Sequence, residues 1–304
     1  MKMNFYGQEL PVFRANLHTH SRVSDGGYTP QEIIDIYANE KYDVLAMTDH
    51  HKMNPVSTYD PKGMTLISGV ELHPMGPREI IWHLLCLNLP EDFPAELYGA
   101  GKKFQTGQET IDAVLAAGGT VFCAHPFWCG VTSGEIMSML SGLAGIEIYN
   151  SSCIGIGKAY NEQSWDELIT AGLVKGAIAV DDTHESIQLF GGWTMIAAPD
   201  RSVDSIMKAL NTGSFYATQG PEFYRLELKD RTFEADFTEA EEAVLMAKGY
   251  IGFTILVQPP SGRGERKTVT TGKVEFPEWF HGPVRLRIRD ANHRYAWSAP
   301  VMVP

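Results

Sequence analysis

Two short motifs in the chain have the spacing of metal-binding pairs. His18 and His20 form an HxH pair, and Asp182 and His184 repeat that spacing in the segment DTH. In extended backbone, side chains two residues apart point to the same side, so the two residues of each pair can bind one ion together. Imidazole nitrogens suit zinc, iron and manganese, and carboxylates suit harder ions. A mixed set of this kind indicates a hydrolytic site with more than one metal ion.

Further metal-capable residues end or closely follow the apolar segments that we interpret as strands. Together with the two pairs, the candidate ligands are His18, His20, Asp25, His50, Glu71, His83, His125, Asp182 and His184, and His83 is placed within or near the end of its strand. The carboxyl ends of parallel strands converge on one face of a closed barrel, so these residues are expected to meet.

A histidine considered alone is more often a core or surface residue than a metal ligand. Six of the ten histidines stand at or beside predicted strand ends, with carboxylates among them, and this joint pattern favours a metal site. His51, His73, His281 and His293 have no comparable place. His51 and His73 are nevertheless near enough in sequence to contact the ligands.

The elements that would position these residues alternate between strand and helix. The predicted strands are 13–18, 43–50, 65–73, 80–87, 119–126, 145–150, 176–184 and 193–198, and the predicted helices are 29–40, 106–119, 161–172 and 202–213. The first two helices open with the capping boxes Thr29/Glu32 and Thr106/Glu109. This order is typical of βα units around a parallel sheet.

The pattern changes near residue 220. The remainder consists of strand-like segments with turn residues between them, although 237–249 is also compatible with a helix by propensity. We therefore predict an α/β protein with a barrel domain over 1–220 and a small, sandwich-like all-β C-terminal module over 221–304. The module is expected to be structural.

Composition narrows the possible partners. The chain of 304 residues has a formal net charge of −12 and no Lys/Arg-rich run, so nucleic acid and anionic lipid are not expected partners. Positive charge in a cleft for an anionic substrate would have to come from bound cations. Without a signal-peptide core or an 18-residue apolar run, we expect a cytoplasmic location and no membrane contact. The four cysteines form no CxxC pair and are predicted to be free, buried thiols. A homo-oligomer is possible.

The motifs NLHTHSRVSDG, VLAMTDHH, ISGVELH, IIWHLLCL, CAHPFW and AVDDTH resemble those of the polymerase-and-histidinol-phosphatase (PHP) family over roughly residues 13 to 200. The resemblance implies a distorted (β/α)7 barrel with a trinuclear site. It places one ion on His18, His20, Glu71 and Asp182, a second on Glu71, His83 and His125, and a third on Asp25, His50 and His184. Asp25 stands where some members have histidine, which predicts a harder or more weakly occupied third site.

The predicted activity is that of a metal-dependent phosphoesterase acting on a small phosphorylated metabolite or nucleotide, with two or three divalent ions (Zn, Mn or Fe). A hydroxide bridging the ions would be the nucleophile. Glu71, Asp182 and His184 are the predicted catalytic residues, and Arg22 and Lys158 are candidates for gripping the phosphate. No polymerase segment accompanies the barrel.

Two alternative functions remain open at this point. The segments GIEIYN, SWDELITAG, VDDTH and TGSFYATQGP resemble a PHP branch that also includes carbamate hydrolases, so the same metal centre could act on carbamate or carboxylic ester bonds. The other alternative is a non-catalytic binding protein that keeps the barrel as a scaffold.

Overall fold

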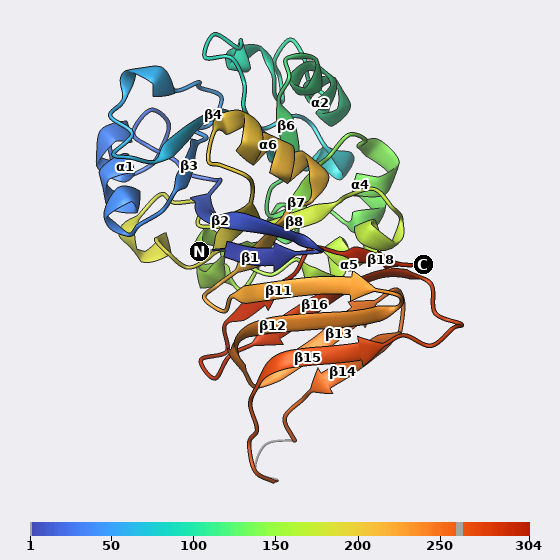
Figure 1. Cartoon of the computed structure of the whole chain (residues 1–304). Coiled ribbons are helices and arrows are strands. Elements are labelled where there is room, and N and C mark those ends of the chain that lie inside the picture. Colours follow the sequence, from blue (N-terminus) through green and yellow to red (C-terminus); the bar gives the residue numbers. More distant parts are fainter. Residues whose placement is uncertain (1, 260–263) are drawn as a thin grey trace.

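The computed structural model describes residues 2–259 and 264–304, which form a mixed α/β protein (Figure 1). Eight of the ten strands described before residue 220 match the predicted ones, and the other two, Lys2–Phe5 and Phe215–Thr218, were not predicted. The ten strands are β1 (Lys2–Phe5), β2 (Gln8–Asn16), β3 (Val44–Met47), β4 (Thr65–Leu72), β5 (Leu84–Leu87), β6 (Thr120–Cys123), β7 (Gly145–Asn150), β8 (Gly176–Val180), β9 (Trp193–Ala197) and β10 (Phe215–Thr218).

The strand directions differ from the all-parallel sheet that was expected. β2, β3 and β4 are parallel neighbours, and so are β6, β7 and β8, but β5 is antiparallel to both β4 and β6. β9 is antiparallel to β2 and β10. The connection from β4 to β5 contains no α-helix, and without such a crossover the next strand can only return antiparallel.

The α-helices surround these strands. They are α1 (Pro30–Asn39), α2 (Gly107–Ala116), α3 (Pro126–Cys129), α4 (Ser133–Met139), α5 (Glu162–Thr170) and α6 (Val203–Thr212). The capping boxes predicted for α1 and α2 are both present. α4 was not predicted, although Thr132 and Glu135 give it a capping box of the same type. No helix in residues 2–259 or 264–304 is long and apolar enough to cross a membrane.

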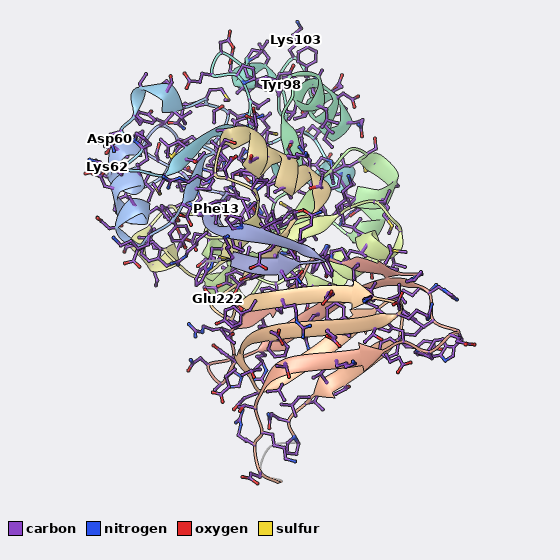
Figure 2. All side chains as sticks on the ribbon, viewed as in Figure 1. Phe13, Asp60, Lys62, Tyr98, Lys103 and Glu222 are labelled. Atoms are coloured by element: carbon purple, nitrogen blue, oxygen red, sulfur yellow. The ribbon has the colours of Figure 1, made fainter. Side chains whose placement is uncertain are left out.

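The described residues after 220 form strands only. These are β11 (Phe223–Lys229), β12 (Thr232–Ala240), β13 (Glu242–Ala247), β14 (Gly252–Leu256), β15 (Val269–Glu275), β16 (Gly282–Arg289), β17 (Tyr295–Trp297) and β18 (Val301–Val303). The segment 237–249 is therefore strand rather than helix. Glu222 lies where the chain passes into these strands (Figure 2).

Strands from before and after residue 220 pair with one another. β1 pairs antiparallel with β2 and parallel with β11, and β10 pairs with β17. In Figure 1, β1 lies between the helix-covered part and the strands β11 to β15. Because β1 joins strands on both sides of residue 220, the division into 1–220 and 221–304 stays a prediction.

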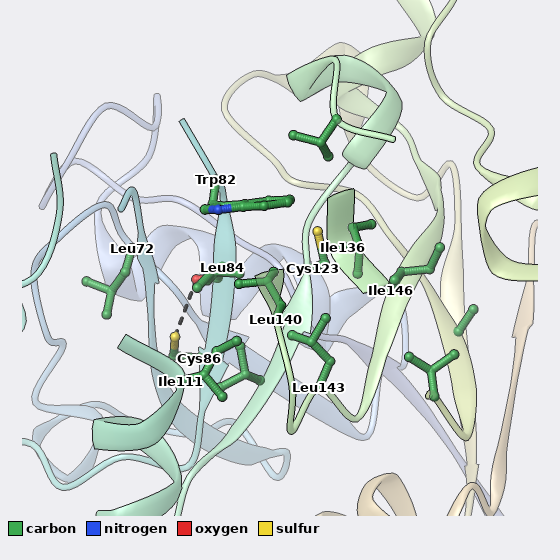
Figure 3. Close-up of a cluster of buried hydrophobic side chains, with 14 of the residues drawn as sticks. Leu72, Trp82, Leu84, Cys86, Ile111, Cys123, Ile136, Leu140, Leu143 and Ile146 are labelled. Atoms are coloured by element: carbon green, nitrogen blue, oxygen red, sulfur yellow. Dashed lines mark hydrogen bonds between the residues drawn. The ribbon is translucent and has the colours of Figure 1, made fainter. Parts of the chain in front are cut away.

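One apolar core includes residues of β4, β5, β6, β7 and α2. Figure 3 shows Leu84 and Cys86 of β5 among Leu72, Ile111, Ile146 and their neighbours, with Trp82 above them. All of these side chains are buried. Burial of this kind contributes about 25 cal/mol per Å² of apolar surface and fixes the strand ends that carry the polar residues. The four cysteines are free, as predicted, and three of them are buried, whereas Cys129 is only partly buried.

A buried arginine joins the C-terminal strands to the helix-covered part. Arg285 of β16 is 1% exposed and donates from Nε to Asp166 Oδ1 (2.7 Å) and from Nη2 to Glu162 Oε1 (3.0 Å), both on α5. Its guanidinium carbon lies 4.6 Å from the ring centroid of Trp165. This ion pair connects elements more than 100 residues apart.

We expect Arg285→Leu to lower the free energy of unfolding by about 2 to 4 kcal/mol, since removing one partner of a buried ion pair leaves the other charges without compensation. The loss is smaller than for a fully buried pair because both carboxylates are partly exposed to solvent. Denaturant unfolding of the full chain measures it. Arg294→Leu, which removes an exposed pair with Asp290, is the control. Equal effects of the two variants would contradict a special role for Arg285.

Candidate metal centre

The two predicted pairs lie side by side at one edge of the sheet. The Asp182 amide donates to the His18 carbonyl (3.0 Å), and the His20 amide donates to the Thr183 carbonyl (3.1 Å). These bonds extend β2 and β8 past their last regular residues. The His18 and His20 side chains are consequently on the same side, with their Nε2 atoms 3.0 Å apart, and both are fully buried.

Glu71 lies at the centre of the cluster. Its Oε2 is 3.2 Å from His18 Nε2, 3.3 Å from His20 Nε2 and 2.9 Å from His50 Nδ1. Its Oε1 is 2.7 Å from His83 Nδ1 and 3.3 Å from His125 Nε2. Asp182 Oδ1 faces the same HxH pair, at 3.2 and 3.0 Å. Glu71 is thus the one carboxylate in contact with five of the predicted ligands.

His83 reaches this edge from the start of a strand, which corrects the predicted position near a strand end. It precedes β5, and Leu84 of β5 pairs with Leu72 at the carboxyl end of β4. Because β5 is antiparallel, its first residues lie at the same edge as the last residues of its neighbours. His83 therefore stands beside His125, with ring centroids 4.9 Å apart.

Asp25 comes to the cluster from the loop after β2. Its carboxylate lies 3.3 Å from His50 Nε2, 3.5 Å from His184 Nε2 and 3.7 Å from His20 Nδ1. The loop is tightly folded at Gly26, where a Cβ would be 2.5 Å from the His20 carbonyl. The Asp25 side chain is 53% exposed, so this group of ligands is the one nearest solvent.

The donor set fits divalent cations. Glu71 Oε2, Asp182 Oδ1 and His50 Nδ1 are buried polar atoms without a hydrogen-bond partner within the described chain. Buried polar atoms rarely stay unpartnered, and here they converge with further ligand atoms. The groups that could hold an ion include His18, His20, Glu71 and Asp182 in one case and His20, Asp25, His50 and His184 in another.

The charges within the cluster are strongly coupled. Burial raises the pKa of Glu71, but the neighbouring imidazoles of His18 and His83 outweigh it and hold that pKa well below its ordinary value. Burial lowers the pKa of His20, but the adjacent carboxylates of Asp182 and Glu71 raise it to about 9. The carboxylates therefore stay ionised and attract positive charge. Protons and divalent cations compete for the same nitrogens.

Sequence reasoning missed a glutamate beneath the ligands. Glu147 of β7 is fully buried and accepts from His18 Nδ1 (2.6 Å), from the His125 amide (2.9 Å) and from Asn150 Nδ2 (2.9 Å). Asn150 also donates to Asp182 Oδ2 (3.0 Å). A carboxylate on the far nitrogen of a ligating imidazole fixes the ring and its tautomer. The signal was a single charged residue in the apolar strand GIEIYN.

Cys129 was also missed. Its Sγ is 3.5 Å from His125 Nδ1, the nitrogen that faces away from Glu71, and it forms a possible ligand group with His83 and His125. The cysteines were predicted only to be free, buried thiols, and Cys129 was not among the candidate ligands. α3 starts directly after His125, which brings Cys129 back by one helical turn.

The other four histidines form two groups, as expected: two lie near the candidate ligands and two lie away from them. His73 Nε2 lies 3.7 Å from Glu71 Oε2, and the His51 ring lies 4.8 Å from that of His73, so both contact the cluster. His281 contacts the Pro304 carbonyl, and His293 contacts Arg289.

The two residues predicted to bind the substrate phosphate do not line the cavity that adjoins the candidate ligands. Arg22 is exposed and donates from Nε to the Gly27 carbonyl (2.9 Å). The Lys158 ammonium lies 5.4 Å from the Phe127 ring centroid. Their role in substrate binding stays a prediction.

Part of the cluster lines a cavity of about 210 Å³. Seven of its lining residues are predicted ligands, and the wall is completed by Trp128, Ser152 and Cys153. Two ligands have unusual backbone geometry, with φ of 53° at Asp182 and 23° at His125. Strained residues of this type occur at functional sites.

No family model matches the chain. Over 124 residues it is 31% identical to a 3',5'-nucleoside bisphosphate phosphatase from Chromobacterium violaceum, with 38% of this chain and 43% of that protein covered. The match thus spans less than half the length of that curated relative.

Two solved structures are similar. One is a two-domain protein from Bacteroides vulgatus containing a predicted PHP-like metal-dependent phosphoesterase, with a TM-score of 0.52, 16% identity and coverage of 97% of this chain and 95% of that one. The other is a putative metal-dependent phosphoesterase from Bifidobacterium adolescentis, with a TM-score of 0.42, 17% identity and coverage of 67% and 98%. The fold is shared with the first along nearly its whole length. The resemblance to PHP-like proteins that the motifs predict is confirmed.

Proposed function

We propose that this chain is a metal-dependent phosphoesterase for a small phosphorylated metabolite or nucleotide. The observation that carries the proposal is the convergence of the His18 and His20 imidazoles on buried carboxylate oxygens of Glu71 and Asp182, two residues that line a cavity. The nucleoside bisphosphate phosphatase activity named for the relative supports the same class of substrate.

We also propose a barrel type for the fold and an assignment of the ligands to individual ions. Within a distorted (β/α)7 barrel, His18, His20, Glu71 and Asp182 would hold one divalent ion, Glu71, His83 and His125 a second, and Asp25, His50 and His184 a third. Ions held there would supply Lewis acidity, which activates water and neutralises charge on a phosphoryl group. Zinc, manganese and iron suit this mixture of imidazole and carboxylate.

The chain's own residues prepare the site in three ways. Glu71 stays ionised and balances several imidazoles at once. Glu147 orients the His18 ring, so that its Nε2 points toward Glu71 and Asp182. The His184 amide donates to Gln188 Oε1 (2.5 Å), and this bond orients the loop that carries His184 and Asp182 at the cavity.

A substrate panel tests the proposal. Purified protein supplied with Mn²⁺, Fe²⁺ or Zn²⁺ should hydrolyse phosphomonoesters, with a nucleoside 3',5'-bisphosphate included in the panel. EDTA should abolish turnover and excess metal should restore it. An aryl carbamate serves as the comparison substrate. Turnover of the carbamate without turnover of any phosphoester, in protein that contains metal, would contradict the proposal.

A further inference from the structure

The wall of the cavity contains an aromatic side chain that metal binding does not require. Trp128 of α3 lines the cavity and is 43% exposed. Its ring lies 5.2 Å from that of His83 and 5.1 Å from that of His125, at angles of 65° and 81°. Among the described residues, no aromatic ring stacks parallel to it. An exposed indole at the mouth of a polar cavity is therefore available to a ligand.

A second aromatic residue adjoins it. Phe127 is 50% exposed, and its backbone amide donates to Asn161 Oδ1 (2.8 Å). The Lys158 ammonium lies over its ring. Lys158 follows the turn η4 (Ser152–Ile156), whose first two residues line the same cavity. The chain segments next to the lining residues Trp128 and Cys153 thus carry flat apolar surface and a cation.

Hydrogen bonds within the protein fix the position of α3, which carries Phe127 and Trp128. The Cys129 amide donates to the His125 carbonyl (3.1 Å), which closes the single turn of α3. Arg78 donates from Nη2 to the Gly130 carbonyl (2.9 Å) and pairs with Glu135 of α4. A surface fixed in this way loses little conformational entropy when a ligand binds.

The size of the cavity indicates how much of a substrate it can enclose. Pockets that enclose a drug-sized ligand have volumes of roughly 300 to 1,000 Å³. The cavity of about 210 Å³ is smaller, so it accommodates the reacting end of a substrate. The remainder of the substrate then extends beyond the cavity, past its exposed lining residues. The exposed aromatic surface among the lining residues is that of Trp128.

We infer that the natural substrate carries a planar aromatic group, such as a nucleobase, next to its phosphoester, and that Trp128 binds this group by stacking. The inference rests on the proposed function and adds the substrate class. Stacking of a base on an aromatic side chain is worth about 1 to 3 kcal/mol, which corresponds to about a 5- to 150-fold change in affinity.

Matched substrates test the inference. Adenosine 5'-monophosphate and ribose 5-phosphate differ only in the base, and we expect the metal-loaded wild type to prefer the former in kcat/KM. Trp128→Leu should reduce the ratio of the two kcat/KM values about 5- to 150-fold, mainly through KM, and Trp128→Phe should retain most of it. Trp279→Leu changes a 66% exposed tryptophan between β15 and β16 and should leave the ratio unchanged.

A binding measurement separates this inference from the proposed function. Calorimetry should show tighter binding of phenylphosphonate than of cyclohexylphosphonate to the metal-loaded protein, and Trp128→Leu should remove the difference. If no phosphoester is hydrolysed but this preference is found, the proposed function fails and the aromatic site stands. Equal binding of the two phosphonates by the wild type, or an unchanged preference in a Trp128→Leu protein with normal metal content, would overturn the inference.

Discussion

Replacement of Glu71 by glutamine should remove bound metal and activity together, with kcat falling about 10³-fold or more. Glu71 contacts His18, His20, His50, His83 and His125, so the lost negative charge affects every proposed ion that shares it. Metal ions supply several kcal/mol of transition-state stabilisation, and each 1.4 kcal/mol is a factor of ten in rate.

The substitution is nearly isosteric, so the fold can be checked independently. Metal content per chain, phosphoester turnover and thermal unfolding are measured on the same preparation. Glu278→Gln, an identical change at an exposed position, is the matched control and should behave as the wild type. Glu71→Gln protein with full activity and normal metal content would show that Glu71 does not hold the ions.

Replacement of Glu147 by alanine should lower metal affinity about 10- to 100-fold, the usual effect of removing a group that orients a metal ligand. The change leaves His18 Nδ1, the His125 amide and Asn150 Nδ2 without their acceptor. His18 is then free to rotate or change tautomer. Because the predicted ligands themselves remain, activity should recover substantially at high metal concentration.

Competition with a chelator of known affinity measures this effect. Glu147→Gln keeps one acceptor oxygen and should have intermediate affinity, which a purely structural role for Glu147 would not produce. Thermal unfolding verifies that both variants are folded, and Glu278→Ala controls for loss of a glutamate. An affinity within two-fold of the wild type for Glu147→Ala would exclude the orienting role.

Much of the fold could be predicted because local patterns are strong here. β7 lies within the bounds predicted for it, and α1 and α2 begin at their predicted capping boxes. The direction of β5 could not be predicted, because an apolar segment of four residues has the same pattern whichever way it runs. The pairing of β1 with β11 is a contact across more than 200 residues, which no local pattern reports.

The candidate site was predicted from residue type and place in the strands, and the structure brings all nine of the predicted ligands together. Their assignment to particular ions stays a proposal. The supporting residues were harder to find. The charge of Glu147 within an apolar strand did not by itself indicate which residues it contacts, and the approach of Cys129 to His125 depends on the turn of α3. Both lie behind a ligand rather than in the cavity, where their role follows only from three-dimensional contacts.

Stoichiometric reconstitution tests the central claim most directly. Protein stripped of metal by chelation is titrated with Mn²⁺, Zn²⁺ or anaerobic Fe²⁺, and bound metal per chain is measured together with phosphoester turnover. We expect no turnover in the stripped protein and turnover that rises to a plateau as two to three equivalents bind. Turnover by the stripped protein, or no bound metal at any concentration, would contradict a metal-dependent phosphoesterase.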